Sequence, residues 1–147
     1  MVDGRPGSLR CAEWGMLRTS PRQEQAVRLN ILHSGITDLT GRQDIETAAI
    51  ESWYVHPMSR SAMAMAEARG AILAALAGAG IPVTEYPPTT IKKAVTSSGR
   101  ADKGQVRTMV TALVGQAPEN DHVADATAAA ICHFASGGLA RAIRAQR

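Results

Sequence analysis

The chain has 147 residues, a length typical of one compact domain that buries roughly two thirds of its unfolded surface. Sixteen Lys and Arg against thirteen Asp and Glu give a net charge of +3, which permits contact with a polyanion without requiring it. Two cysteines far apart, Cys11 and Cys132, indicate neither a disulfide framework nor a zinc knuckle and favour reduced thiols in a cytoplasmic protein. The longest apolar stretch, residues 71–83, falls short of the roughly twenty residues that span a bilayer. We therefore expect a single cytoplasmic domain over residues 1–147, with no membrane helix and no secretory signal.

The first part of the chain predicts a turn, a strand, a helix and a second strand. Residues 1–8 contain strong turn dipeptides, and residues 9–19 are expected to form a strand. From Pro21, with Ser20 as N-cap, apolar residues recur at helical spacing up to Gly41. The apolar run at 47–51 fits a buried parallel strand that ends in a carboxylate.

The second part of the chain alternates in the same way. A well-buried helix is expected over 59–79, a strand over 82–86 and a short helix from Pro87 to Val95. A further helix over 102–113 and a last one over about 121–134 complete the chain. The apolar face of the helix at 102–113 is expected at Val106, Met109, Val110 and Leu113. This alternation predicts an α/β fold with a largely parallel sheet and helices on its faces.

Three polar side chains could carry chemistry. Glu51 ends an apolar strand, where a buried carboxylate needs a compensating cation or metal, although it could equally reach solvent there. His122 and Asp125 are three residues apart and so project from one face at the start of the last helix, but a polar first turn favoured by the helix dipole explains them as well. Asp121, which could also act as an accessory ligand, is better explained as the N-cap of that helix.

Aromatic and basic side chains could contact a nucleic acid. The adjacent Trp53 and Tyr54, just after Glu51, suit stacking on bases, or else they pack on the domain. A set of cations before and on the helix at 102–113 could bind phosphates, or else form a solvated face: Lys92, Lys93, Arg100, Lys103 and Arg107.

Taken in order, these segments resemble the RuvC family of Holliday-junction resolvases over essentially the whole chain. Trp14–Thr19 is similar to that family's third strand, Ala49–Tyr54 to its second acidic motif with the aromatic loop that follows, and Ala66–Gly70 to a family helix. The later match is the most specific. It consists of Ile91–Val95, Gly99–Val106 and His122–Ala126, which follow the family's order and approximate spacing, including the variant with His in place of the third acidic ligand.

The resemblance implies an RNase H-like fold, with a mixed sheet flanked by helices, and a metal-dependent DNA endonuclease that resolves four-way junctions in recombination and repair. It makes Glu51, His122 and Asp125 three of four residues that hold two Mg²⁺ ions, for which Mn²⁺ can substitute. It further implies a homodimer, with the helix at 63–77 as our candidate interface, and a branch-migration helicase complex as partner.

The family's remaining ligand belongs to an Asp-Pro-Gly motif on its first strand, and no Asp-Pro-Gly occurs in this chain. We expect the chain to begin after the family's first two strands, with roughly twenty residues absent, and to cleave weakly or not at all. A catalytically dead junction-binding or scaffold protein of the same fold is the alternative. An RNase H-like nuclease acting on RNA fits the Gly-Arg-Ala-Asp-Lys and Glu-Ser-Trp-Tyr segments less well.

Overall fold

The computed structural model of the protein describes residues 1–5, 7–52 and 60–137. These residues form two compact units, and each is described by itself below. Unit 1 comprises 1–15, 49–53 and 84–147, and unit 2 comprises 16–48 and 54–83. The single domain expected over the whole chain stays a prediction.

A β-hairpin opens unit 1. Strands β1 (Val2–Arg5) and β2 (Ser8–Cys11) pair antiparallel over their full lengths. Gly4, at φ +126°, lies within β1, and a Cβ added there would come 2.2 Å from the carbonyl oxygen of Ser8, so this position requires glycine. The prediction of a turn over 1–8 is therefore wrong for most of its length.

The strand expected over residues 9–19 is also shorter than predicted. It ends at Cys11, because β1 supplies only four residues to pair with. Beyond that point the backbone N–H groups of Ala12 and Glu13 both donate to the carbonyl oxygen of Met1, which closes the hairpin. Residues 12–20 belong to neither helix nor strand.

Strands β3 (Ala48–Glu51) and β4 (Val83–Tyr86) form a second two-stranded sheet, as predicted from their apolar runs. The N–H of Ala48 donates to the carbonyl of Pro82 (2.9 Å), and the N–H of Ser52 donates to the carbonyl of Tyr86 (2.8 Å). Donor and acceptor both advance by four residues between these two bonds, so the strands run parallel. The side chain at the carboxyl end of β3 is Glu51.

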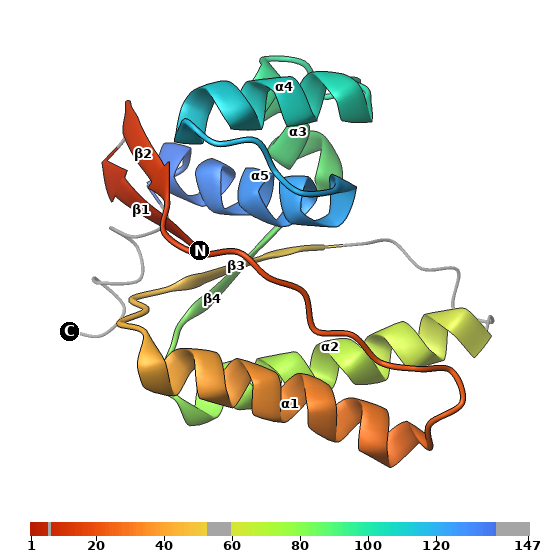
Figure 1. The fold of residues 1–147 in the computed structure, drawn as a ribbon. Coiled ribbons are helices and arrows are strands. Elements are labelled where there is room, and N and C mark those ends of the chain that lie inside the picture. The colour runs from red at the N-terminus through yellow and green to blue at the C-terminus, as the bar shows by residue number, and fades with distance from the viewer. Residues whose placement is uncertain (6, 53–59, 138–147) are drawn as a thin grey trace. The chain divides into compact units, whose positions relative to one another are not determined.

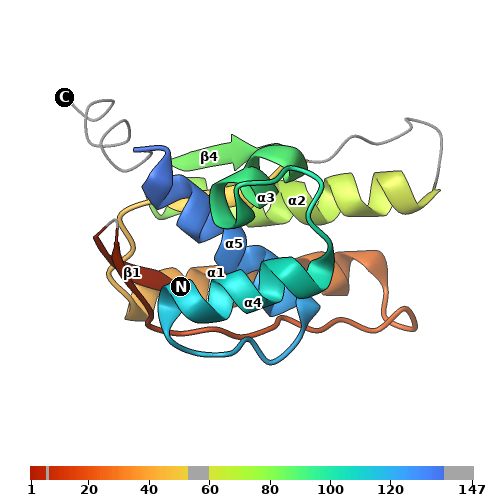
Figure 2. The ribbon, with the colours of Figure 1, turned by 90° about the horizontal axis from the view of Figure 1, so that it is seen from above.

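Three helices and the hairpin build the core of unit 1. Helices α3 (Pro88–Thr96), α4 (Lys103–Val114) and α5 (Asp121–Ala135) pack on one another, and the hairpin packs on α4 and α5 (Figure 1). The three helices are again neighbours in the view from above (Figure 2). Eleven buried side chains form this core: Tyr86, Ile91, Val95, Ala101, Val106, Val110, Val114, Ala128, Ala129, Ile131 and Cys132.

The apolar face of α4 differs from the one expected. Val106, Val110 and Val114 are buried, whereas Met109 and Leu113 are each 37% exposed. The buried residues recur every four positions, which follows one ridge of the helix. Helix α5 covers this ridge with small residues, so the contact stays narrow and the flanking side chains remain outside it.

In unit 2, helices α1 (Gln25–Arg42) and α2 (Arg60–Gly78) lie side by side (Figure 1). Helix α1 begins four residues later than predicted. The Ser20 hydroxyl accepts a hydrogen bond from the N–H of Arg22 (3.2 Å), which forms a turn before the helix instead of capping it. The methyl groups of Leu17 pack against Gly35, where an added Cβ would lie 2.4 Å from them.

Candidate functional site

The carboxylate of Glu51 is fixed at the end of β3 by the strand pairing. The hydrogen bond from the N–H of Ser52 to the carbonyl of Tyr86 holds the backbone directly after it. The side chain of Glu51 is exposed and not buried in the core, which decides between the two readings of the sequence in favour of a carboxylate open to solvent or to a ligand.

Helix α5 begins at an asparagine cap. The side-chain oxygen of Asn120 accepts from the N–H of Val123 (3.0 Å), so Asn120 and not Asp121 is the N-cap. The prediction for Asp121 is wrong because both residues can cap and only the backbone angles of Asn120 are extended. Asp121 stands in the first turn, where its charge complements the helix dipole, and its carboxylate lies 3.7 Å from the ammonium of Lys103.

His122 and Asp125 are both exposed near the start of α5, while Val123 and Ala124 between them are buried. Two residues three apart point about 60° from one another around a helix, so both project from the side that faces away from those buried neighbours. The exposed first turns of α5 are thus available to a ligand.

Glu51 and Asp125 influence each other electrostatically. Partial loss of solvent raises the pKa of Glu51 above its ordinary value, and the negative charge of Asp125 raises it further. The ammonium of Lys92 acts in the opposite direction and lowers this pKa. The charges of Asp125 on α5 and of Lys92 on α3 therefore both act on the carboxylate of Glu51 at the end of β3.

His122 is not part of a similarly close group. Among the residues that the structure describes, no three His, Cys, Asp or Glu side chains lie close enough to one another to hold a metal ion. The expected grouping of Glu51, His122 and Asp125 is therefore not found among the described residues, and the roles of all three as metal ligands stay predictions.

The five predicted phosphate contacts differ in what they do. Lys92 is half-buried on α3, whereas Lys93 and Arg100 are exposed. Lys103 is 71% exposed at the start of α4 and pairs with Asp121. Arg107 donates from Nη2 to the carbonyl of Pro118 (2.8 Å), so this guanidinium ties α4 to the segment that leads into α5.

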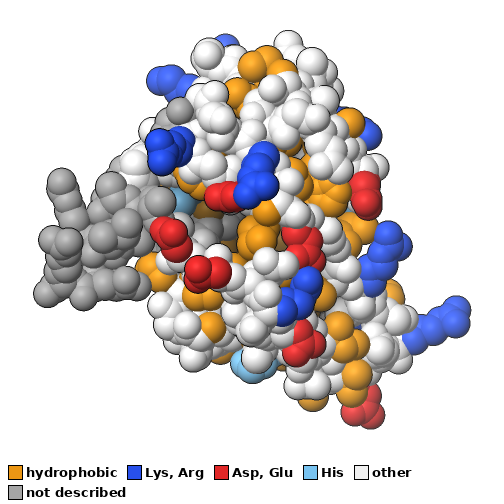
Figure 3. Space-filling view, turned by 60° about the vertical axis from the view of Figure 1, so that its left-hand side comes forward, with side chains coloured by type: hydrophobic (Ala, Val, Ile, Leu, Met, Phe, Trp, Pro, Cys, Tyr) orange, Lys and Arg blue, Asp and Glu red, His pale blue; other side chains and the backbone are white. Residues whose placement is uncertain are grey.

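The space-filling view shows how cations are spread on one face of the molecule. The Lys and Arg side chains stand there as separate patches with acidic and apolar side chains between them (Figure 3).

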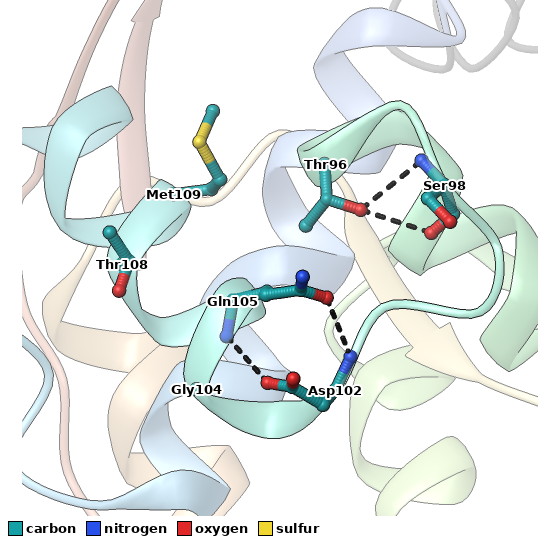
Figure 4. Close-up of a pocket in the computed structure, with 7 residues that line it drawn as sticks. All are labelled: Thr96, Ser98, Asp102, Gly104, Gln105, Thr108 and Met109. Atoms are coloured by element: carbon teal, nitrogen blue, oxygen red, sulfur yellow. Dashed lines mark hydrogen bonds between the residues drawn. The ribbon is translucent and has the colours of Figure 1, made fainter.

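A hollow of about 530 Å³ opens between the end of α3 and the start of α4 (Figure 4). Its polar groups are occupied by helix capping. The carboxylate of Asp102 accepts from the N–H of Gln105 (2.9 Å), and the Gln105 side chain accepts from the N–H of Asp102 (3.0 Å). The Thr96 hydroxyl likewise bonds to the backbone of Ser98 on both its N–H and its carbonyl. We therefore assign no binding role to this hollow.

Other predictions meet the structure in different ways. Cys11 and Cys132 are both free thiols, as expected, and burial raises the pKa of each. The cytoplasmic location inferred from them stays a prediction. No helix within the described residues is long and apolar enough to cross a membrane. The aromatic pair Trp53 and Tyr54 lies outside the residues that the structure describes.

The sequence profile of the RuvC crossover junction endodeoxyribonucleases matches residues 1–133 of this chain. The chain belongs to the RuvC family. Among curated proteins, the RuvC endonuclease of Moorella thermoacetica is 42% identical over 135 residues, which cover 90% of this chain and 81% of that protein. The RuvC endonuclease of Chloroflexus aggregans is also 42% identical over 135 residues, covering 90% of this chain and 82% of its own length.

Solved structures of RuvC share the fold. A structure of Thermus thermophilus RuvC has a TM-score of 0.84 and 29% identity, covering 95% of this chain and 86% of that one. The same protein in complex with its Holliday junction substrate has a TM-score of 0.88 with the same identity and coverage. The RNase H-like α/β fold expected for a RuvC family member is thereby confirmed.

Sequence reasoning missed three side-chain interactions on the elements around the candidate site. Asn120 caps α5. Asn is as good an N-cap as Asp, so the sequence offered Asn120 as a candidate beside Asp121. The contact of Arg107 with Pro118 had no signal, because a carbonyl acceptor can lie on any residue. The hydrogen bond between Tyr86 and His133 joins residues 47 positions apart, which no local pattern reveals.

The raised pKa of Glu51 predicts how the metal-free protein responds to pH. Folding raises the pKa of Glu51, so the protonated carboxyl of Glu51 stabilises the folded state at pH values below its ordinary pKa. This stabilisation is lost as the pH rises through the raised pKa. Glu51→Gln should therefore stabilise the metal-free protein at neutral pH, by less than about 1 kcal/mol because solvent screens an exposed pair. Urea unfolding at pH 4 and pH 7.5, with Glu119→Gln as the exposed control, measures this. Equal effects of both substitutions at pH 7.5 would contradict the assigned pair.

Arg107→Ala should lower the free energy of unfolding by roughly 1.5–3 kcal/mol, because the carbonyl of Pro118 loses its donor. This is the usual contribution of a hydrogen bond from a charged group. Arg100→Ala is the matched control, since that side chain is exposed in the loop before α4. Thermal unfolding of the two variants compares them. A similar loss of stability in both would mean that the contact of Arg107 contributes nothing.

Proposed function

We propose that this chain is a structure-selective DNA endonuclease that cleaves four-way junctions. The observation that carries the proposal is the carboxylate pair of Glu51 and Asp125 at the carboxyl end of β3, in a chain of the RuvC family. The negative charge of Asp125 raises the pKa of Glu51, so this site can accept positive charge in addition to that of Lys92. A divalent cation supplies that charge, and carboxylate oxygens are the ligands that Mg²⁺ and Mn²⁺ prefer.

The residues present thus fit a divalent metal, held by Glu51 and Asp125 with His122 as a further ligand. When bound, two such ions activate a water and stabilise the leaving oxygen of the phosphodiester. The chain's own residues orient the substrate. Glu51 and Asp125 are fixed by β3 and α5, and Lys92 beside them can neutralise part of the scissile phosphate's charge.

Contacts outside the carboxylate pair serve binding. Lys93, Arg100 and Lys103 are exposed cations, and Arg107 keeps further donors besides the one that Pro118 occupies. These groups favour contacts to phosphates, which position the DNA without reading its sequence. Trp53 and Tyr54 follow Glu51 in the chain and would stack on bases exposed at the junction.

The function is tested by incubating the chain with a mobile four-way junction, a linear duplex of the same sequence, and an RNA–DNA hybrid, each with Mg²⁺ or Mn²⁺. We expect symmetrical nicks in the junction alone, and none with EDTA. Cleavage of the hybrid in preference to the junction would replace this proposal with an RNA-directed nuclease. Tight junction binding without cleavage, in every form of the chain, would support the alternative of a catalytically dead junction-binding or scaffold protein.

The small negative charge of the proposed ligands favours slow turnover by this 147-residue chain. Glu51 and Asp125 contribute two negative charges and His122 none, against a total of +4 on two divalent ions. The sequence contains no Asp-Pro-Gly, the motif that carries the remaining family ligand. We therefore propose weak cleavage by these 147 residues, with junction binding retained through the cations described above.

Lys103→Ala should weaken junction binding and flatten the slope of log affinity against log salt by up to about 0.9, the contribution of one neutralised phosphate. Titrations of labelled junction in EDTA at several salt concentrations measure the slope. Asp121→Asn is the matched control, because it removes the intramolecular partner of Lys103 and leaves the cation in place. A slope unaltered in Lys103→Ala would make this cation part of a merely solvated surface.

We further propose a homodimer, because a four-way junction has two symmetry-related cleavage points. Helix α2 supports this choice of interface. Met63 is 64% exposed and Met65 51% exposed, although both are large and apolar. Sedimentation should show a dimer that Met63→Glu dissociates. An interaction with a branch-migration helicase complex belongs to the same proposal by family resemblance.

A further inference from the structure

A buried polar pair links β4 to α5 inside unit 1. The hydroxyl of Tyr86 lies 3.0 Å from Nδ1 of His133, and the two rings meet edge to face with centroids 5.8 Å apart. Tyr86 is 6% exposed and His133 is 4% exposed. His133 and Thr127 are the two buried polar side chains among the described residues. The hydroxyl of Thr127 donates within its own helix, to the carbonyl of Val123 (2.7 Å).

Each partner lies on an element that carries one of the two carboxylates. The carbonyl of Tyr86 accepts from the N–H of Ser52, so the same residue that bonds to His133 also holds the backbone next to Glu51. His133 lies on α5, eight residues after Asp125 and on the same continuous helix. A displacement of the Tyr86–His133 pair would therefore move the end of β3 and the helix of Asp125 relative to one another.

We propose that Tyr86 and His133 are positioning residues that set the separation of the Glu51 and Asp125 carboxylates. The inference rests on the proposed function of that carboxylate pair. Apolar contacts between α5 and its neighbours are non-directional and tolerate small shifts, whereas a hydrogen bond fixes both distance and orientation. Three of the eight buried residues of α5 are alanines, and such short side chains contribute little interdigitation to stop the helix from sliding.

Stability and positioning can be separated by mutation, because they respond differently to removal of one or both partners. Tyr86→Phe or His133→Leu leaves one buried polar group without its partner and should destabilise the fold. The double variant Tyr86→Phe/His133→Leu leaves neither, so much of the lost stability should return. If the pair only stabilises the fold, the affinity for metal should recover together with the stability in the double variant. If the pair positions the carboxylates, the affinity of the double variant should stay low.

The experiment titrates Mn²⁺ into the 147-residue protein by calorimetry, alongside thermal unfolding. Loss of a residue that orients a ligand typically weakens metal binding about 10- to 100-fold. We expect a loss in this range in Tyr86→Phe and in the double variant, even though the double variant unfolds later than either single one. His133→Asn, whose amide can occupy the place of Nδ1, should restore binding in part. Thr127→Val, which removes a buried hydroxyl that bonds within α5, should bind Mn²⁺ as the wild type does.

Two outcomes would overturn the inference. One is Mn²⁺ affinity unchanged in Tyr86→Phe, and the other is affinity that returns with stability in the double variant. If the wild type neither binds Mn²⁺ nor cleaves a junction, the proposed function itself fails. Hydrogen exchange of the Ser52 amide then decides the positioning role without any metal. Exchange several-fold faster in Tyr86→Phe and in the double variant supports it, and exchange equal to that of Thr127→Val overturns it.

Discussion

Extending the chain at its N-terminus by the family's first two strands, including Asp-Pro-Gly, is expected to raise the rate of junction cleavage by at least about 100-fold. The added aspartate would bring the carboxylate charge facing two divalent ions from −2 to −3. An additional anionic ligand would hold divalent ions more tightly, and the chemistry that such ions would supply should gain accordingly. Junction binding should change much less, because phosphate contacts and metal ligands are different residues.

Single-turnover cleavage of a four-way junction, with protein in excess over DNA, measures this prediction. The matched control carries Asn-Pro-Gly in place of Asp-Pro-Gly, so that both extended chains gain the same strands and differ in one carboxylate. Equal rates for the 147-residue chain, the extended chain and the Asn control would show that the assigned centre does not perform the cleavage.

The second large effect is expected at the carboxylate pair itself. In the extended chain, Asp125→Asn and Glu51→Gln should each lower the cleavage rate by at least about 100-fold while leaving junction affinity in EDTA within about twofold. Each substitution keeps the size of the side chain and removes one anionic ligand. Glu119→Gln, an exposed neutralisation in the segment before α5, is the control and should cleave at the wild-type rate.

A combined variant sharpens this test. Because both carboxylates are assigned to one centre, Glu51→Gln/Asp125→Asn should cost much less than the product of the two single losses. Multiplicative losses would indicate two independent effects, and a rate unaffected by either substitution would remove Glu51 and Asp125 from the site.

The sequence predicted most of the helices and strands, because in strongly patterned segments the local order of apolar and polar residues determines the secondary structure. The strand at 48–51 is a short apolar run and was predicted within one residue of its observed bounds. The bounds of α5 were also predicted within one residue, although its cap is Asn120 and not Asp121. The expected strand over 9–19 failed for a tertiary reason. Its length depended on a partner, and β1 ends after four residues. Whether Met109 is buried likewise depended on what α4 packs against.

The roles of Glu51 and Asp125 as ligands stay predictions. Both residues also had ordinary structural explanations, a strand that ends at solvent and a polar first turn of a helix, and the family resemblance favoured the functional interpretation. Arg107 was predicted to contact phosphates from its charge alone. Its hydrogen bond to the carbonyl of Pro118 depends on the tertiary position of the segment after α4, which the sequence does not give. Which exposed cation reaches DNA is set by geometry that sequence spacing does not contain.

The alanine-rich interior of α5 also restricts how this protein can change over evolutionary time. Ala128 is fully buried and Ala124 is 2% exposed, so at these two positions the helix touches its neighbours through methyl groups. One additional methylene there would overpack the core at a cost of roughly 1–3 kcal/mol and push the whole helix outward. Lineages descended from this chain should accept glycine, alanine or serine at position 128 and little else, whereas exposed positions of α5 other than His122 and Asp125 should tolerate more substitutions.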